Sequence, residues 1–182
     1  MKRKLPLLGG LAVVALLAGA CASLGPRRPP LATVPSVDLQ RYAGKWFEIA
    51  AYPHFFQRGC TGSTAEYAAL PDGRISVTNR CVKNGESVTV RGVARVVPGS
   101  GNARLKVRIG PAPFAGDYWV IALDSRDYQW AVVGHPSRNY LWILARRPTL
   151  DPALYQRLLR EIERLGYDPA RIVKTPPAPP AT

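Results

Sequence analysis

The chain holds few residues whose side chains are typical of catalysis. It has two histidines, His54 and His135, and both fall in segments expected to be loops. The sequence contains no Gly-x-Ser-x-Gly motif for a nucleophile, no spaced set of metal ligands and no glycine-rich loop for phosphate. We therefore predict no enzyme, no cofactor and no metal site. The alternative is a haem or metal site built on the two histidines, which both fall at the same end of the expected fold.

The first of three cysteines has the setting of a lipid attachment site. Cys21 follows a basic stretch, Lys2 to Lys4, and an apolar stretch from Leu5 to Ala20. This pattern is typical of a signal peptide over residues 1–20 and is too short for a spanning helix. Residues 17–21 resemble a bacterial lipoprotein processing site, although Ala18 stands where leucine is usual. Cys21 is thus expected to carry acyl groups such as palmitate, with simple secretion as the alternative.

The other two cysteines form an even pair. Cys60 and Cys81 lie in a chain that the signal segment directs out of the cytoplasm. Paired cysteines in an oxidising compartment indicate a disulfide bond. We predict a Cys60–Cys81 bridge that closes a loop of roughly 20 residues.

Composition limits the kind of partner. The 182 residues carry a net charge of +13, and the basic residues are spread along the chain. Such a charge favours acidic lipid headgroups and other anions. No nucleic-acid-binding motif is present, so we predict no nucleic acid partner. The alternative is a solvated basic surface with no specific partner.

Alternating apolar and polar residues predict strands through most of the chain. Pro71-Asp72-Gly73 and Asn84-Gly85 have the composition of hairpin turns between two such strands. Successive strands joined by short turns favour an all-β fold, an eight-stranded antiparallel up-and-down β-barrel. The expected strands cover residues 45–52, 63–70, 74–82, 87–97, 103–109, 117–123, 129–133 and 140–145.

One C-terminal α-helix follows the expected strands. Asp151 and Pro152 form an N-cap and a first helical position, which predicts a helix over residues 151–165 packed outside the barrel. A short last strand is expected within residues 170–174. The proline-rich residues 21–36 read as a linker that begins at the acylated cysteine, and residues 175–182 as a disordered tail. The folded domain is therefore expected to span residues 37–174.

Three motifs in this order resemble those of the lipocalin family, and most closely its bacterial outer-membrane lipoprotein branch. Gly44-Lys45-Trp46 matches the Gly-x-Trp of the first strand, and Arg146 matches the arginine after the eighth strand. Residues 121–124 stand where the second motif ends, although the usual Thr-Asp-Tyr is absent. The resemblance covers residues 37–174. It implies that Gly44, Trp46 and Arg146 close one end of the barrel, with the arginine over the indole.

The resemblance also implies an elongated apolar cavity with its mouth at the opposite end. Side chains at alternate strand positions share a face, so one set is expected to line the cavity. A second set flanks the mouth, where the aromatic residues would either contact a membrane or fold back as a lid. The first set is Tyr118, Val120, Tyr140, Trp142 and Leu144, with Ala122 by the same alternation; the second is Phe55, Phe56, Phe114, Arg58 and Arg138.

These features together predict an outer-membrane lipoprotein that binds, stores or transports fatty acids or lysophospholipids. Membrane maintenance or a stress response would be its role, and the periplasmic face its expected location. Two alternatives are an enzyme on the same scaffold and a surface interaction protein that works through its basic exterior. A homodimer of a closed barrel would have to use loops or the helix face.

Overall fold

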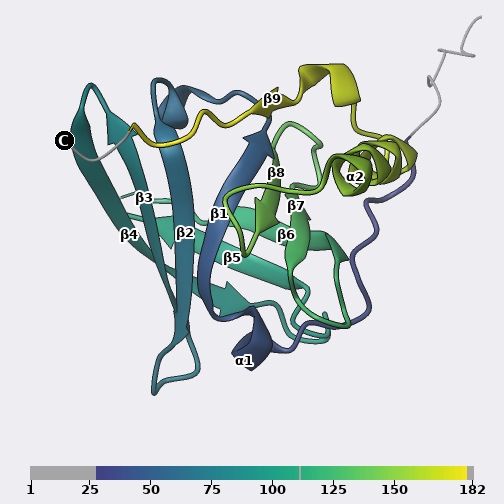
Figure 1. The fold of residues 1–182 in the computed structure, drawn as a ribbon. Helices are drawn as coiled ribbons and strands as arrows, with labels where there is room; N and C mark the ends of the chain where they lie inside the picture. The colour runs from purple at the N-terminus through teal and green to yellow at the C-terminus, as the bar shows by residue number, and fades with distance from the viewer. Residues whose placement is uncertain (1–27, 111, 180–182) are drawn as a thin grey trace, which may run out of the picture.

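A computed structural model of the chain describes residues 28–110 and 112–179. Figure 1 shows strands wrapped around a common axis with one helix at the side. The eight main strands agree in number and order with those predicted. They are β1 Gly44–Ala51, β2 Thr61–Ala69, β3 Ile75–Lys83, β4 Glu86–Val96, β5 Arg104–Ile109, β6 Gly116–Leu123, β7 Trp130–Gly134 and β8 Leu141–Ala145.

The sheet closes on itself. Each of these strands pairs antiparallel with the next, and β1 pairs with both β8 and β2. Asn84 and Gly85 both have positive φ at the β3–β4 turn, as a tight hairpin requires. The predicted up-and-down barrel is therefore confirmed. A ninth strand, β9 Val173–Lys174, pairs with the mouth end of β1.

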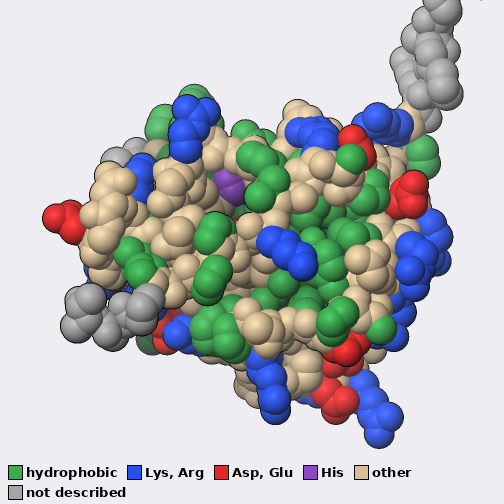
Figure 2. All heavy atoms as spheres, turned by 45° about the horizontal axis from the view of Figure 1, so that its top comes forward, with side chains coloured by type: hydrophobic (Ala, Val, Ile, Leu, Met, Phe, Trp, Pro, Cys, Tyr) green, Lys and Arg blue, Asp and Glu red, His purple; other side chains and the backbone are tan. Residues whose placement is uncertain are grey.

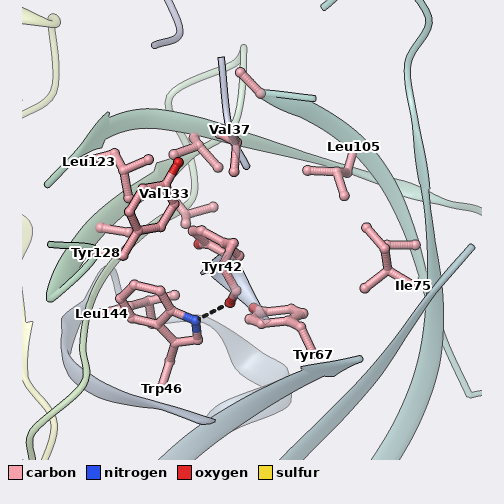
Figure 3. Packing of buried hydrophobic residues seen from close by; sticks show 14 of the residues in the cluster. Val37, Tyr42, Trp46, Tyr67, Ile75, Leu105, Leu123, Tyr128, Val133 and Leu144 are labelled. Carbon is pink, nitrogen blue, oxygen red and sulfur yellow. Dashed lines mark hydrogen bonds between the residues drawn. The ribbon is translucent and has the colours of Figure 1, made fainter. Parts of the chain in front are cut away.

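The hydrophobic core has two parts. The first fills the barrel beside the closed end and includes Trp46, Tyr67, Leu105 and Val133 (Figure 3). The second lies between the outer face of the barrel and α2 Pro152–Arg164, where Leu158 and Ile162 are fully buried. The Asp151 carboxylate accepts from the Leu154 N–H at 2.8 Å and caps α2, as predicted.

A register shift in β6 changes which residues face inward. The pairing of β6 with β7 is irregular between Val120 and Ala122. Val120 stays in the core inside the barrel, whereas Ala122 belongs to the core beneath α2 and Leu123 takes the inward place. The expectation that Ala122 lines the cavity was therefore wrong, because a bulge breaks the two-residue alternation.

Parts of the predicted linker and of the predicted tail pack against the barrel. Within the predicted linker, Leu31 is 3% exposed in the core beneath α2, and the Val34 N–H donates to the Val120 carbonyl at 3.0 Å. Within the predicted tail, Pro176 accepts from the Gly62 N–H at 2.8 Å. Residues 28–36 and 175–176 thus lie against the barrel. The signal segment and Cys21 lie outside the described residues.

The connecting helices are short. They are α1 Leu39–Tyr42, η1 Phe55–Gln57 and η2 Pro169–Arg171. In the described part of the chain, no helix has the length and apolarity needed to cross a membrane.

Candidate functional site

Arg146 closes one end of the barrel. Its guanidinium carbon lies 3.8 Å from the centroid of the Trp46 ring. The same guanidinium donates to the backbone carbonyls of Arg41, Ala43 and Lys45 at 2.7–2.9 Å. The contact predicted between this arginine and the tryptophan is thus present. The arginine also satisfies the carbonyls at the point where α1 passes into β1.

The tryptophan and glycine of the first motif fit the same arrangement. The Trp46 Nε1–H donates to the Tyr42 carbonyl at 2.8 Å (Figure 3), so the buried indole has its partner. Gly44 has φ +90°, and a Cβ built there would lie 3.5 Å from an Arg146 nitrogen. The positive φ explains the glycine at this position.

Three tyrosines meet above this closed end. The Tyr118 hydroxyl lies 2.8 Å from the hydroxyl of Tyr42 and 2.8 Å from that of Tyr67. Burial raises the pKa of Tyr67 to about 12 and also raises the pKa values of Tyr42 and Tyr118. All three phenols are therefore neutral at pH 7. They line a cavity of about 230 Å³ whose other walls include Ile75, Ala94, Leu105 and Val120.

The end of β4 opposite the closed floor is exposed to solvent. By the β3–β4 register, Val88 and Val90 share the face of Ala94, which is buried inside the barrel. They are 38% and 42% exposed. The pairing of β4 with β5 runs only from Gly92 to Val96, so this part of β4 has β3 as its one strand neighbour. This face of β4 is therefore apolar from Val88 to Ala94, and its mouth end is exposed to solvent.

An aromatic stack lies at the mouth. The His54 and Phe56 rings are parallel at 4.2 Å, and the Tyr140 and Trp142 rings are parallel at 6.1 Å. The His54 ring lies 5.2 Å from that of Trp142 and so joins the two pairs. Of the predicted lining residues, Trp142 and Leu144 pack with the core inside the barrel, as do Tyr118 and Val120. Tyr140 stands at the rim within the stack.

A polar network below this stack was not predicted. The Gln57 amide donates to the Glu48 carboxylate at 2.8 Å and accepts from the Trp142 Nε1–H at 3.2 Å. The second Glu48 oxygen accepts from the Thr175 hydroxyl at 2.7 Å. Glu48 lies two residues after Trp46 in β1, and side chains two positions apart share a face of a strand. The inward direction of Glu48 could therefore be predicted from the sequence. Glu48, Gln57 and Thr175 border a cleft of about 250 Å³ that His54 and Ser63 also line.

The predicted mouth residues divide into three groups. Phe55 and Phe114 are 77% and 82% exposed, and Arg58 is exposed beside Phe55. Phe56 turns toward the stack. Arg138 is 8% exposed and donates to the carbonyls of Leu165 and Pro29 at 2.8 Å. Its assignment to the mouth was wrong, because this arginine caps the end of α2 instead.

Cys60 and Cys81 are joined, with an S–S distance of 2.08 Å, as predicted. The bridge links the start of β2 to the end of β3 at the mouth. Within residues 28–110 and 112–179, no group of three or more His, Cys, Asp or Glu side chains is placed to hold a metal ion, and this includes the surroundings of His54 and His135. Burial lowers the pKa of both histidines, which favours neutral imidazoles at pH 7.

Among the described residues, the face of the molecule at the mouth carries no single cluster of basic side chains (Figure 2). In Figure 2, with the mouth end turned toward the viewer, Lys and Arg side chains are spread among hydrophobic and polar ones. This agrees with their spread along the sequence. The arrangement as a whole offers an apolar interior, a closed floor and an aromatic rim, which suits non-covalent binding.

Comparison with known protein families gives a match to the Lipocalin-like domain over residues 37–177. The chain is 39% identical over 173 residues to the outer membrane lipoprotein Blc of Escherichia coli (strain K12), which covers 94% of this chain and 96% of that protein. It is 39% identical over 151 residues to temperature-induced lipocalin-1 of Arabidopsis thaliana, covering 79% of this chain and 81% of that one.

Among solved structures, insecticyanin from the tobacco hornworm Manduca sexta superimposes with a TM-score of 0.65. The sequences are 21% identical, and the match covers 81% of this chain and 84% of insecticyanin. At this identity the likeness concerns the fold alone.

Proposed function

Because this chain belongs to the lipocalin family, we propose that it binds fatty acids or lysophospholipids non-covalently inside the barrel and stores or transports them. The observation that carries the proposal is an apolar cavity inside the barrel above a floor at Trp46 and Arg146, with the exposed valines Val88 and Val90 at the mouth end of β4. Along β4, Val88 to Ala94 spans about 20 Å, at roughly 3.3 Å per residue. That depth suits an extended acyl chain.

The ligand lies with its polar group at the mouth. The apolar walls bury the chain, while the stack of His54, Phe56, Tyr140 and Trp142 surrounds its upper part. Phe55 and Phe114 are exposed large apolar side chains beside the mouth and contact a bilayer during loading. Arg58 lies in the same rim and meets a lipid phosphate or carboxylate.

Native mass spectrometry of protein extracted from membranes tests this function. We expect a bound species with the mass of a fatty acid or lysophospholipid, which gas-phase activation releases intact. A barrel that carries no lipid and also fails to bind fluorescent fatty acids would refute the proposal.

Replacing Trp142 with alanine is expected to weaken acyl-chain binding by about tenfold. The indole supplies part of the buried wall, and a loss of about 1.4 kcal/mol corresponds to that factor. Competition with a fluorescent fatty acid measures the change. The matched control is Trp119→Ala, since Trp119 packs in the core on the outer face. Equal affinities for Trp142→Ala and the parent protein would remove Trp142 from the site.

We further propose attachment to the outer membrane through acylated Cys21, with the barrel on the periplasmic side. The lipoprotein names of relatives such as Blc of Escherichia coli support this location. A role in membrane maintenance follows, because a lipid binder held at the bilayer meets its ligands there. Several acyl chains anchor stably, at about 0.8 kcal/mol for each buried CH₂.

Cys21→Ser should abolish membrane attachment, because serine cannot receive the thioether-linked lipid. We expect the parent protein in the membrane pellet after cell fractionation and the variant in the soluble fraction or retained as unprocessed precursor. A variant that is processed normally and still sediments with washed outer membranes would rule out the anchor.

A further inference from the structure

The three tyrosines above the closed end cannot all be satisfied by one another. Tyr42, Tyr118 and Tyr67 hold three hydroxyl protons, but only two contacts of 2.8 Å join their oxygens. Each contact uses one proton. Whichever way the two hydrogen bonds run, one O–H is left without an acceptor. Within the described residues these hydroxyls make no other hydrogen bond to the protein.

The unpaired O–H lies at an apolar cavity. All three tyrosines line the space of about 230 Å³, together with Ile75, Leu105 and Val107. Tyr42 and Tyr67 are buried, so bulk water does not solvate their oxygens. A buried donor without a partner costs free energy, and a ligand atom that accepts from it gains affinity.

The chemistry of the surroundings selects a neutral acceptor. Glu48 points into the barrel and opposes a negative charge near Tyr67, whose pKa it helps to raise. Arg146 is committed to backbone carbonyls and the Trp46 ring, and Arg74 at the edge of the cavity pairs with Asp72 at 2.6 Å. An anionic carboxylate at this depth would have no free cation to pair with among these residues. A hydroxyl or ketone oxygen needs none.

Resting on the proposed function, we propose that the barrel prefers acyl ligands that carry a neutral oxygen at the end of the chain farthest from the mouth. The apolar chain fills the interior along β4 and β5. Its terminal hydroxyl or keto oxygen then accepts from the tyrosine cluster. The binding site therefore recognises both ends of its ligand, the polar group at the rim and an oxygen at the floor.

Competition binding with three probes tests the preference on the purified full-length protein. The probes are hexadecanoic acid, ω-hydroxyhexadecanoic acid and a hexadecanoic acid with its hydroxyl at mid-chain. We expect the ω-hydroxy acid to bind about fivefold more tightly than hexadecanoic acid, as one net hydrogen bond provides. The mid-chain isomer should bind more weakly than both, because its hydroxyl meets an apolar wall.

Two variants separate hydrogen bonding from packing. Tyr67→Phe leaves two hydroxyls and one contact, so one proton remains unpaired and the preference for the ω-hydroxy acid should persist. Replacing all three tyrosines with phenylalanine keeps the shape of the rings and removes every hydroxyl. On this triple variant the two affinities are compared with each other, and ω-hydroxyhexadecanoic acid should no longer bind more tightly than hexadecanoic acid.

Equal affinity of the parent protein for hexadecanoic and ω-hydroxyhexadecanoic acids would overturn the inference and leave the proposed function standing; a water held by the tyrosines would give this result. A preference that survives in the folded triple variant would also overturn it. If none of the three probes binds, this inference is overturned; the proposed function fails as well when native mass spectrometry also finds no lipid bound to the protein extracted from membranes. If the triple variant does not fold, the affinities of the parent protein for the ω-hydroxy and mid-chain acids still test the preference, because equal affinities would overturn it.

Discussion

Arg146→Ala is expected to lower the free energy of unfolding by about 3 kcal/mol or more. The change removes the contact with Trp46, worth about 1–2 kcal/mol when partly desolvated. It also leaves the carbonyls of Arg41, Ala43 and Lys45 without their charged donor, and hydrogen bonds to charged groups contribute about 1.5–3 kcal/mol each. Water entering the gap offsets part of this sum. Urea unfolding, followed by tryptophan fluorescence, measures the difference.

Two neighbouring substitutions bracket that result. Arg146→Lys keeps a cation beside the indole but has no planar fork to reach several carbonyls, so we expect an intermediate loss. Arg147→Ala, at the exposed next position, should change stability by less than about 0.5 kcal/mol. If Arg146→Ala unfolded at the same urea concentration as Arg147→Ala, the closed end would not depend on this arginine.

The strands were predictable because alternation is a local property. Inward and outward side chains follow a two-residue period wherever the ladder is regular, as from Tyr118 to Val120. The bulge between Val120 and Ala122 depends on the pairing of β6 with β7, and the residue types in this segment do not predict it. One displaced residue therefore transferred Ala122 from the cavity to the core beneath α2.

Contacts between distant segments were less accessible to sequence reasoning. Arg138 reads as an ordinary loop arginine, but in the fold the loop lies beside the C-terminus of α2, where the Leu165 carbonyl needs a donor. The prolines near both ends argue against strands and helices, yet a proline carbonyl still accepts a hydrogen bond. Pro176 does so from Gly62, and Pro29 from Arg138. A proline-rich segment without regular secondary structure can therefore still pack against the barrel.

Part of the candidate site could be predicted from the alternation of side chains along the strands. Alternation along β6 and β8 identified Tyr118 and Trp142 as inward residues, and the structure places both inside the barrel. Tyr42 was missed because it belongs to the four-residue α1, which is too short to give a periodic signal. The tyrosine cluster exists because this helix folds under the barrel and directs Tyr42 toward Tyr118.

Removing the disulfide with Cys60→Ser and Cys81→Ser is expected to lower the free energy of unfolding by about 3 kcal/mol. The two cysteines are 21 residues apart, and a loop of that size restricts the unfolded chain by about this amount in the chain-entropy model. The bridge also holds the mouth end of β2 in the folded barrel. β2 pairs with β1 only from Thr64 to Tyr67, so its mouth end is held by β3, the bridge and Pro176.

The loss should therefore be larger at the mouth than at the floor. In hydrogen exchange we expect amides near Thr61 and Val82, which pair beside the bridge, to lose protection. Amides around Trp46 should keep theirs relative to the new global stability. Reductant should destabilise the parent protein to a similar extent and leave the double variant unaffected, since that variant has no bond to break. Uniform loss of protection from floor to mouth would mean that the bridge acts on the unfolded chain alone.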